Sequence, residues 1–466
     1  PGPSSDCIIF QSIDSGTEDF HLRNDSNNDA INAGDDLSAT FIHDIDGDTR
    51  PSGSGWDVGA DEYINPCDDS FSKRKQITIN YTKVGLDNNP GTLSDFPVLI
   101  SLTDSDLAYP TGDVTDPQGD DIIFRASDGR TQLDHEVEEY VDSSGKLVAW
   151  VRVPTVSKSA NTVIYMYYGN TCITTSQENA TGVWNSDYKG VWHLKEAGDE
   201  TGYDYQDSTS NGNHGQGGGG TAAYVPTQAN GKISKGQQFD GSDDRIEVPN
   251  STSLNIMTDD VTVEGWIYSA DTSPDGAVAI KSNDSSTAYY GLTFESSNIW
   301  VYTDHGGGDF NWNTGQTIGT AGWHHVAFTY DGVTRRLYID GDEKTTSDTS
   351  GNLDDGSSEP LWMGRNPFTG STEGIIDEVR ISEYPRSDHW IKTSFNTVNE
   401  PGDIGTSGKF YDVGSEEAAP ATAVTLVSFT AAGCDGEVAL EWETGSEREN
   451  LGFNVFRREG EAGPFI

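Results

Sequence analysis

The segment WHHVAFTYDGVTRRLYIDG, residues 323–341, contains two adjacent histidines, a tryptophan and two aspartates. Histidine and aspartate are residue types that bind metals or transfer protons. The same segment has the pattern of two β-strands, because apolar residues alternate along WHHVAFTY and two Asp-Gly pairs supply turns. Adjacent residues of a strand point to opposite faces of a sheet. We therefore expect that His324 and His325 do not bind one metal ion and that this segment is a fold motif.

A candidate calcium site is the motif DIDGD, in which Asp44, Asp46 and Asp48 alternate around a glycine. Carboxylate oxygens are the ligands that Ca²⁺ prefers, and the glycine permits a tight turn. The rest of the EF-hand pattern is absent, so a solvated turn remains the alternative. We predict that these three aspartates bind Ca²⁺.

A candidate ligand platform is the stretch NIWVYTDHGGGDFNWN, which places Trp300, Tyr302 and Trp312 around a glycine-rich loop. Sugar rings have an apolar face that stacks on aromatic side chains, while polar neighbours bind the hydroxyl groups. Packing of these rings in a core is the alternative. We predict that the three rings bind a glycan or another cell-surface ligand.

The patterns that would indicate catalysis are missing. Many glycoside hydrolases place two carboxylates across the cleaved bond, and related glucanases carry them on one strand as Glu-x-Asp-x-x-Glu. The sequence contains neither this pattern nor Gly-x-Ser-x-Gly, His-Glu-x-x-His or a phosphate-binding loop. We predict no catalytic residues and no enzymatic activity.

The composition excludes several classes of partner and indicates an all-β chain. The formal charge is −48, from 76 acidic and 28 basic residues, so we expect no binding to nucleic acid, which requires clustered Lys and Arg. No apolar stretch approaches the roughly 20 residues of a membrane span, so we expect no membrane insertion. The 53 glycines and the alternating segments rich in Thr, Tyr and Trp predict β-strands joined by tight turns. A length of 466 residues predicts several modules.

Residues 67–175 are predicted to form a small β-sandwich. The segments LVAWVRVP and TVIYMYYGN alternate in the way that strands with one buried face do. The phrases FPVLISL, DDIIFRASDG and MYYGN resemble the bacterial domain family of unknown function 2341, for which no catalytic residues are known. This resemblance implies that a laminin G-like module follows on a secreted surface protein.

Residues 182–399 contain an ordered set of motifs, GVWHLKE, GQQFDGSDDRIEVP, VTVEGWIYS, WHHVAFTYDG, LWMGRNP and GIIDEVRIS. This order resembles laminin G-type, concanavalin A-like jelly rolls. The resemblance implies a structural calcium ion near DSTSNGNHG and IIDEVRI, with Asp207, Asn213 and Asp377 as ligands and Asp240 as a further candidate. The alternative for Asp377 is that it caps a turn.

The remaining segments lie at the two ends. Residues 1–66 contain the stretch ATFIHDIDGDTRPSGSGWDVGADEY, which resembles the terminal rungs of secreted right-handed parallel β-helix proteins. Residues 400–423 are rich in Gly, Pro, Ala and acidic residues, so we predict a linker there. Residues 424–466 contain three predicted strands and resemble the start of a fibronectin type III-like domain.

The four cysteines lack any spacing suited to zinc. Cys67 directly precedes the first predicted strand of the small sandwich and Cys172 directly follows the last one, so we predict a disulfide between them. A disulfide between Cys7 and Cys67 remains the alternative. Either bridge implies an oxidising, extracellular setting.

Taken together, these patterns predict an all-β chain of tandem modules, in which a small β-sandwich precedes a concanavalin A-like jelly roll. We predict a non-catalytic bacterial surface protein that is secreted and that adheres or binds glycans through the jelly roll. One alternative is a structural subunit of an extracellular filament or coat, assembled by strand pairing between chains. A second alternative is an accessory region of a carbohydrate-active enzyme.

Overall fold

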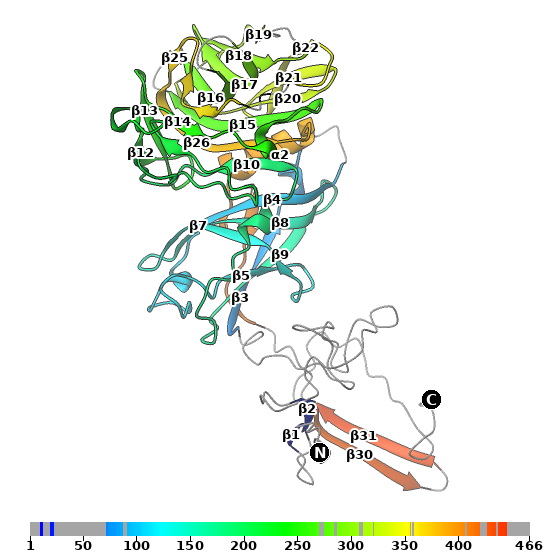
Figure 1. Cartoon of the computed structure of the whole chain (residues 1–466). Helices are drawn as coiled ribbons and strands as arrows, with labels where there is room; N and C mark the ends of the chain where they lie inside the picture. The colour runs from blue at the N-terminus through cyan, green and yellow to red at the C-terminus, as the bar shows by residue number, and fades with distance from the viewer. Residues whose placement is uncertain are drawn as a thin grey trace, which may run out of the picture. The chain divides into compact units, whose positions relative to one another are not determined.

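A computed structural model describes residues 71–86, 91–269, 275–283, 287–306, 311–319, 321–354, 356, 358–405 and 408–419, together with four strands nearer the termini. The chain forms two compact units. One unit comprises Pro1–Ser72, Asn170–Cys172 and Ala418–Ile466, and the other comprises Lys73–Gly169 and Ile173–Glu417. The second unit consists of two β-sandwiches (Figure 1). The prediction of an all-β chain is confirmed, because almost every element is a strand.

In the first unit, the described elements are two antiparallel strand pairs. Strands β1 (Phe10–Ser12) and β2 (Asp19–Leu22) form one pair, and β30 (Leu426–Cys434) and β31 (Glu437–Thr444) form the other. Strands β30 and β31 coincide with two of the three strands predicted in 424–466. The other parts of the β-helix and fibronectin-like segments, including the DIDGD motif, lie outside the described residues, and both resemblances stay predictions.

The smaller sandwich of the second unit has two sheets. One sheet has the strand order β27-β28-β3-β9-β5-β6, with β29 also paired to β3, and the other has the order β4-β8-β7. The strands are β3 (Lys73–Ile79), β4 (Leu93–Thr103), β5 (Ile123–Arg125), β6 (Gln132–Leu133), β7 (His135–Val141), β8 (Lys146–Val156), β9 (Thr162–Tyr168), β27 (Asp403–Ile404), β28 (Tyr411–Val413) and β29 (Glu417–Ala418).

Strand β28 corrects the prediction that residues 400–423 form a linker. Phe410, Tyr411 and Val413 are buried in the small sandwich, and β28 pairs antiparallel with β3. The Tyr411 hydroxyl accepts a hydrogen bond from Ser101 N at 2.7 Å and donates one to Ser101 O at 3.0 Å, which ties β28 to the opposite sheet. The linker prediction was wrong because three apolar side chains are embedded in a segment whose Gly, Ser and acidic residues are typical of linkers. The jelly roll is therefore inserted between two parts of the small sandwich.

The larger sandwich consists of an eight-stranded and a seven-stranded sheet, as predicted for a jelly roll. The eight-stranded sheet has the order β12-β13-β26-β15-β20-β21-β22, with β10 also paired to β26, and the seven-stranded sheet has the order β11-β14-β23-β16-β17-β18-β19. A short hairpin of β24 and β25 stands apart.

The bounds of the eight-stranded sheet are β10 (Tyr188–Trp192), β12 (Thr227–Asn230), β13 (Lys235–Asp240), β15 (Asp260–Ser269), β20 (Gly322–Asp331), β21 (Thr334–Ile339), β22 (Asp342–Asp348) and β26 (Glu373–Ser382). Those of the seven-stranded sheet and the hairpin are β11 (Gln216–Gly217), β14 (Ile246–Val248), β16 (Gly276–Ser282), β17 (Ala288–Glu295), β18 (Asn298–Thr303), β19 (Asn311–Asn313), β23 (Leu361–Met363), β24 (Arg365–Asn366) and β25 (Gly370–Ser371).

Strand β20 confirms the prediction for the histidine pair. Val326, Phe328 and Tyr330 point into the core between the two large sheets, which places His325 on the opposite, outer face. His324 Nδ1 lies 2.9 Å from an oxygen of Asp340, whereas His325 Nε2 lies 3.2 Å from Glu264. The two histidines therefore have different partners and share no site.

Part of the outer face of the eight-stranded sheet is covered within the same unit. Helix α2 (Asp388–Asn399) begins at an N-cap, where the Ser387 hydroxyl accepts a hydrogen bond from Trp390 N. Its Phe395 stacks on Trp266 of β15 at 5.6 Å, and its Trp390 packs on Phe96 of β4 at 4.8 Å. Strands β10 and β26 and this helix lie next to the small sandwich (Figure 1). One core cluster accordingly runs through the small sandwich and onto this face.

Candidate functional site

The outer face of the seven-stranded sheet carries a continuous row of side chains. Its inner face supplies the core through residues such as Leu361, Leu292 and Val301, so the residues between them point outward. The strand register aligns one outward residue from each strand in a single row, which runs Gln216, Glu247, Trp362, Ile280, Gly291, Tyr302 and Asn311. Trp300 lies in the neighbouring row, between Thr293 and Asn313.

Among the described residues, four aromatic side chains gather on this surface, which we call the aromatic face: Trp300, Tyr302, Trp362 and Phe368. Tyr302 and Trp362 are buried at its floor, whereas Trp300 and Phe368 are partly exposed. Phe368 comes from the β24–β25 hairpin, and its ring centre lies 6.0 Å from that of Tyr302. The hairpin thus places the partly exposed ring of Phe368 above the buried ring of Tyr302, which belongs to the sheet.

A carboxylate fixes the floor of the aromatic face. Glu295 Oε1 accepts hydrogen bonds from the Tyr302 hydroxyl, from Asn366 Nδ2 at 3.0 Å and from the Thr293 hydroxyl at 3.3 Å. Asn366 is fully buried at the base of the hairpin. These bonds join the hairpin to β17 and β18, so the rings are held in place before any ligand arrives.

Two arginines border the aromatic face. The Arg245 guanidinium lies 5.6 Å from the Trp362 ring centre and 4.5 Å from that of Tyr224, and the Arg365 guanidinium lies 5.9 Å from Trp362. Each guanidinium carries several N–H groups beside apolar rings, and Arg245 Nη1 already donates to Asp243 O at 3.4 Å. Rings flanked by such donors suit a ligand that has both an apolar face and hydroxyl groups.

The structure separates one predicted platform residue from the other two. Trp300 and Tyr302 both lie on the aromatic face, but Trp312 pairs with Val301 and therefore points to the inner side of the sheet. There its ring lies 5.3 Å from the Arg335 guanidinium. Phe368 was missed from the sequence, because the strand register that brings the hairpin to this face is a long-range property.

Asp207 and Asn213, two of the predicted calcium ligands, form one hydrogen-bonded loop. Asp207 Oδ1 accepts from the backbone N–H groups of Val191 and Thr209, and its Oδ2 accepts from Thr209 Oγ1 and from Asn213 N at 2.8 Å. Asn213 Oδ1 accepts a hydrogen bond from the Ser251 hydroxyl at 2.5 Å. In the structure this carboxylate organises the loop through protein donors.

The other predicted calcium ligands lie elsewhere. Asp240 is one of three neighbouring acidic residues with Asp243 and Asp244. Asp377 is fully buried on β26, where its Oδ2 accepts a hydrogen bond from Ile233 N at 3.0 Å and its Oδ1 has no partner. Asp44, Asp46 and Asp48 lie outside the described residues. Calcium binding by any of these residues stays a prediction.

A cluster of charges that sequence analysis missed lies where the two sandwiches meet, and we call it the junction cluster: Glu136, Glu138, His193, Glu378 and Arg380. His193 Nδ1 lies 2.6 Å from Glu378 Oε1 and 3.7 Å from Glu138 Oε2, and its Nε2 lies 3.2 Å from Glu136 Oε2. Arg380 donates to Glu378 Oε2 at 2.6 Å. All five side chains are buried.

Indole rings enclose the junction cluster. Trp150 Nε1 donates to Glu138 Oε2 at 3.2 Å, and Trp184 Nε1 donates to Glu136 Oε2 at 2.7 Å. The Arg380 guanidinium lies over both rings, at 4.2 Å from Trp150 and 4.8 Å from Trp184. Glu138 Oε1 is buried without a hydrogen-bond partner. The cluster therefore has a low-dielectric surround and one unsatisfied carboxylate oxygen.

The pKa values in the junction cluster are shifted by burial and by neighbouring charges. Burial and the negative charge of Glu378 raise the pKa of Glu138 to about 8. Burial opposes ionisation of Glu136, but the charge of His193 and hydrogen bonds from His193, Ser208 and Trp184 lower its pKa to about 2. Burial alone would lower the pKa of His193, yet the charges of Glu378 and Glu136 raise it well above its usual value.

Two backbone irregularities position the junction cluster. Glu378 has a φ of 55° and Leu194, next to His193, has a φ of 57°, which are left-handed conformations that non-glycine residues rarely adopt. The pairing of β15 with β26 shifts between Glu264 and Trp266, so a bulge at Glu378 turns its side chain to the outer face of the sheet. The alternation of residues in EGIIDEVRIS did not predict that the Glu378 side chain lies on the outer face, because a bulge interrupts the two-residue period of a strand.

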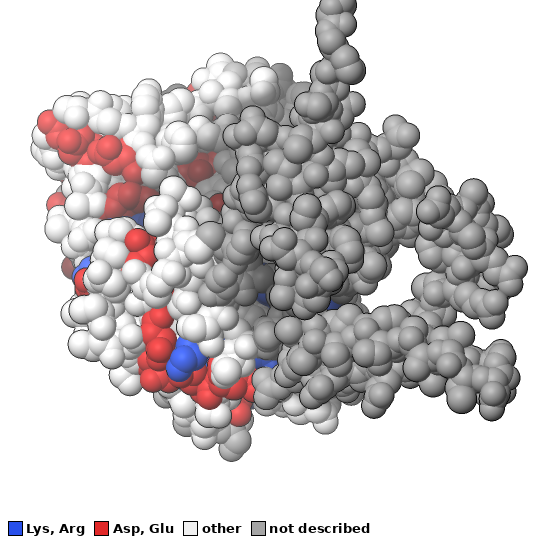
Figure 2. All heavy atoms as spheres, turned by 90° about the horizontal axis from the view of Figure 1, so that it is seen from below, with Lys and Arg blue, Asp and Glu red and all other residues white. Residues whose placement is uncertain are grey.

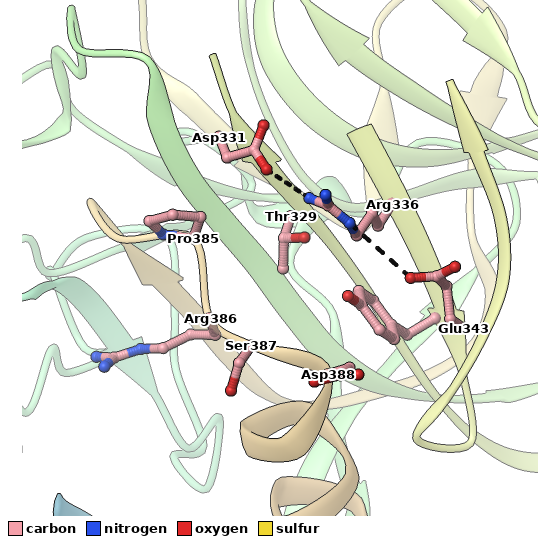
Figure 3. A pocket seen from close by; sticks show the side chains of 9 residues that line it. Thr329, Asp331, Arg336, Glu343, Pro385, Arg386, Ser387 and Asp388 are labelled. Atoms are coloured by element: carbon pink, nitrogen blue, oxygen red, sulfur yellow. Dashed lines mark hydrogen bonds and ion pairs between the residues drawn. The ribbon is translucent and has the colours of Figure 1, made fainter. Parts of the chain in front are cut away.

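A polar pocket of about 340 Å³ lies on the outer face of β20–β22 beside the start of α2 (Figure 3). Arg336 points into it, and its charge is balanced by Asp331 at 2.6 Å and Glu343 at 3.9 Å. The Arg386 side chain points away from Arg336 (Figure 3). Because the one inward-facing cation already has two carboxylates, the pocket has little charge left to attract a ligand.

Two further observations concern a disulfide and the possibility of a membrane-spanning helix. Cys172 is disulfide-bonded, and the side chains of the other three cysteines lie outside the described residues, so its pairing with Cys67 stays a prediction. Within the described residues, neither α-helix has the length and apolar character needed to cross a membrane.

In comparisons with known proteins, two segments of the chain match family models. Residues 240–392 match the concanavalin A-like lectin/glucanases superfamily, and residues 118–195 match the domain of unknown function 2341. No curated protein matches the chain significantly.

Three solved structures are similar to parts of the chain. Domain 4 of AbnA, an extracellular GH43 arabinanase from Geobacillus stearothermophilus solved with arabinotriose, is 20% identical, with 45% of this chain and 98% of that chain covered and a TM-score of 0.37. The binding domain of Paraclostridial Mosquitocidal Protein 1 is 12% identical, with 60% and 73% covered and a TM-score of 0.35. The binding domain of Botulinum neurotoxin DC, solved with rat synaptotagmin II, is 14% identical, with 46% and 52% covered and a TM-score of 0.32.

The two predicted resemblances are thus confirmed in their stated order along the chain. In the order of the chain, residues 118–195 match the model of the domain of unknown function 2341, and residues 240–392, in the jelly roll, match that of the concanavalin A-like lectin/glucanases superfamily.

Proposed function

We propose that the jelly roll binds a glycan on the aromatic face of its seven-stranded sheet. The observation that carries this proposal is the pair of partly exposed rings, Trp300 and Phe368, above a floor fixed by Glu295. The other large sheet has its outer face packed against α2 and the small sandwich. The seven-stranded sheet therefore offers the broader free surface for a ligand.

The chemistry of this face fits a sugar chain. Stacking of a sugar ring on Trp300 buries the apolar faces of both, and the amides of Asn311 and Asn313 are exposed on the same side to bind hydroxyl groups. Trp362, Ile280 and Tyr302 in the middle of the row are buried, so a sugar would contact the partly exposed rings of Trp300 and Phe368 and the exposed side chains of Asn311 and Asn313.

We propose further that this binding is not coupled to catalysis and that it serves attachment outside a bacterial cell. The absence of paired-carboxylate motifs in the sequence supports the first point, and the disulfide at Cys172 supports an oxidising compartment. An accessory role beside a carbohydrate-active enzyme remains the second candidate, since glycan binding serves both. Incubation of the chain with its bound glycan should release no reducing ends.

The experiment is a glycan array with the full chain, followed by calorimetric titration of the best-binding oligosaccharide. Trp300→Ala should weaken binding about 5- to 30-fold, because a lost stacking contact costs about 1–2 kcal/mol. Trp312→Ala is the matched control, since it removes the same ring from the inner side of the adjacent strand. Equal loss in both variants, or no binding by the wild type across a broad array, would reject the proposal.

A further inference from the structure

The junction cluster has the composition of a transition-metal site. Glu138, His193 and Glu378 each place one ligand atom within 4.8 Å of the other two, and all three residues are buried. They come from β7 of the small sandwich, from the residue after β10 and from β26 of the jelly roll. One nitrogen and two carboxylate oxygens form a mixed donor set that suits Zn²⁺, whereas Ca²⁺ prefers oxygen donors alone.

The distances between these donor atoms lie just below and just above the distances expected between the ligand atoms of a zinc site. Ligand atoms that lie about 2.0–2.2 Å from a tetrahedral Zn²⁺ are separated from one another by about 3.3–3.6 Å. His193 Nδ1 lies 2.6 Å from Glu378 Oε1 and 3.7 Å from Glu138 Oε2. Small rotations of the carboxylates would therefore admit the ion.

The groups around these three residues are those that orient metal ligands. A histidine that binds a metal through one nitrogen usually donates its other N–H to a carboxylate. Nε2 of His193 lies 3.2 Å from Glu136, which is itself held by Trp184 at 2.7 Å and by Ser208 at 2.6 Å. Arg380 orients Glu378 in the same way through its second oxygen.

An observation independent of the donor spacing also favours a cation site here. Glu138 is 6% exposed, and its Oε1 has no hydrogen-bond partner although it is buried beside other acidic groups. Oδ1 of Asp377, the neighbour of Glu378 on β26, is also buried without a partner. Buried carboxyl oxygens are normally satisfied by a donor or a cation, so a bound cation would supply the partner that Glu138 Oε1 lacks.

We propose that Glu138, His193 and Glu378 bind one Zn²⁺ ion that clamps the small sandwich to the jelly roll. The second oxygen of Glu138 or a water molecule completes the coordination. The ion has a structural role, because the indole rings of Trp150 and Trp184 close the site to substrates. This clamp holds the aromatic face in a fixed direction relative to the small sandwich and does not depend on what that face binds.

The test uses the full chain, stripped of metal with a chelator and then titrated with ZnCl₂. We expect one zinc per chain by elemental mass spectrometry and a rise in the melting midpoint of about 4 °C at a hundredfold excess over the dissociation constant. Glu138→Gln should abolish this rise, since an amide keeps the shape of the side chain and can still accept from Trp150, but is a poor zinc ligand.

Glu264→Gln is the matched control. Glu264 forms a buried pair with His325 at 3.2 Å on the same sheet. Among the described residues, this pair is not part of any cluster that could hold a metal ion. This variant should keep the response to zinc. The proposal is overturned if zinc fails to shift the wild-type midpoint, if Glu138→Gln responds as the wild type does, or if Ca²⁺ produces the same shift through Glu138.

A spectroscopic measurement covers the case in which Glu138→Gln does not fold. Co²⁺ in a four-coordinate site with one nitrogen ligand gives intense visible absorption, which we expect on adding CoCl₂ to the metal-free wild type and which ZnCl₂ should remove. Absence of this absorption at saturating cobalt would contradict the site.

Discussion

At the scale of single residues, the cost of a substitution depends on whether a charge is buried. Arg380 and Glu378 have side chains that are 5% and 1% exposed, whereas Arg336 and Asp331 are each 32% exposed. In both ion pairs the guanidinium nitrogen lies 2.6 Å from the carboxylate oxygen. Burial decides the difference, because a buried carboxylate that loses its partner cannot be compensated by water.

We predict that Arg380→Met lowers the free energy of unfolding by about 3–5 kcal/mol, because it leaves Glu378 buried without its guanidinium partner. Arg336→Met should cost about 1 kcal/mol or less, since solvent screens that pair. Denaturant unfolding of the two variants measures the difference. Equal costs would show that the junction cluster is more hydrated than the structure indicates.

A second prediction at this scale concerns pH. Burial lowers the pKa of His135, which is 1% exposed and packs edge-on against Phe124 at 5.5 Å. The unfolded chain then takes up a proton near pH 6.5 that the folded chain does not, so this residue makes stability fall as the pH drops below about 6.5.

The variant His135→Asn removes this titration. The difference in unfolding free energy between the wild type and His135→Asn should therefore shift in favour of the variant between pH 7 and pH 5. Melting curves at both pH values provide the measurement. A difference that does not change with pH would contradict a lowered pKa of His135.

At the scale of elements, local patterns predicted the strands well and their long-range partners poorly. The alternation in WHHVAFTY placed His324 and His325 on opposite faces correctly, because the two-residue period is a local property. The segment 408–418 looked like a linker, since only pairing with β3, more than three hundred residues away, reveals it as a strand. The bulge at Glu378 and the hairpin that carries Phe368 were invisible for the same reason.

The returning strand gives a prediction about truncation. A chain that ends after Ala419 keeps β28 and should melt as the full second unit does. A chain that ends after Gly402 loses the buried Phe410 and Tyr411, each worth about 3–5 kcal/mol in a core, and should melt at least about 10 °C lower or fail to fold. Similar melting of the two truncations would show that β28 adds nothing to the small sandwich.

At the scale of the whole second unit, two sandwiches share one continuous core. The cluster that fills the small sandwich extends to Trp266, Ala327 and Tyr338 on the outer face of the large one. Acidic side chains predominate over the basic ones that are visible on the face of the molecule in Figure 2, in keeping with the net charge of −48. This charge favours solubility and opposes binding to polyanions.

Because the core and the chain both cross between the sandwiches, the second unit should unfold in one step. Calorimetry of the chain that ends at Ala419 should show a single transition for both sandwiches, with equal calorimetric and van't Hoff enthalpies. Arg380→Met should shift that transition without splitting it. Two separate transitions in the wild type would mean that the junction is a weak contact between independent domains.

The central claim is that the aromatic face binds a glycan, and a crystal structure of the chain with its best-binding oligosaccharide tests it most directly. We predict that a sugar ring stacks on Trp300, with a neighbouring unit beside Phe368 and hydroxyl groups bonded to Asn311 or Asn313. A sugar found instead in the polar pocket beside Arg336, or on the covered side near Trp312, would contradict the claim.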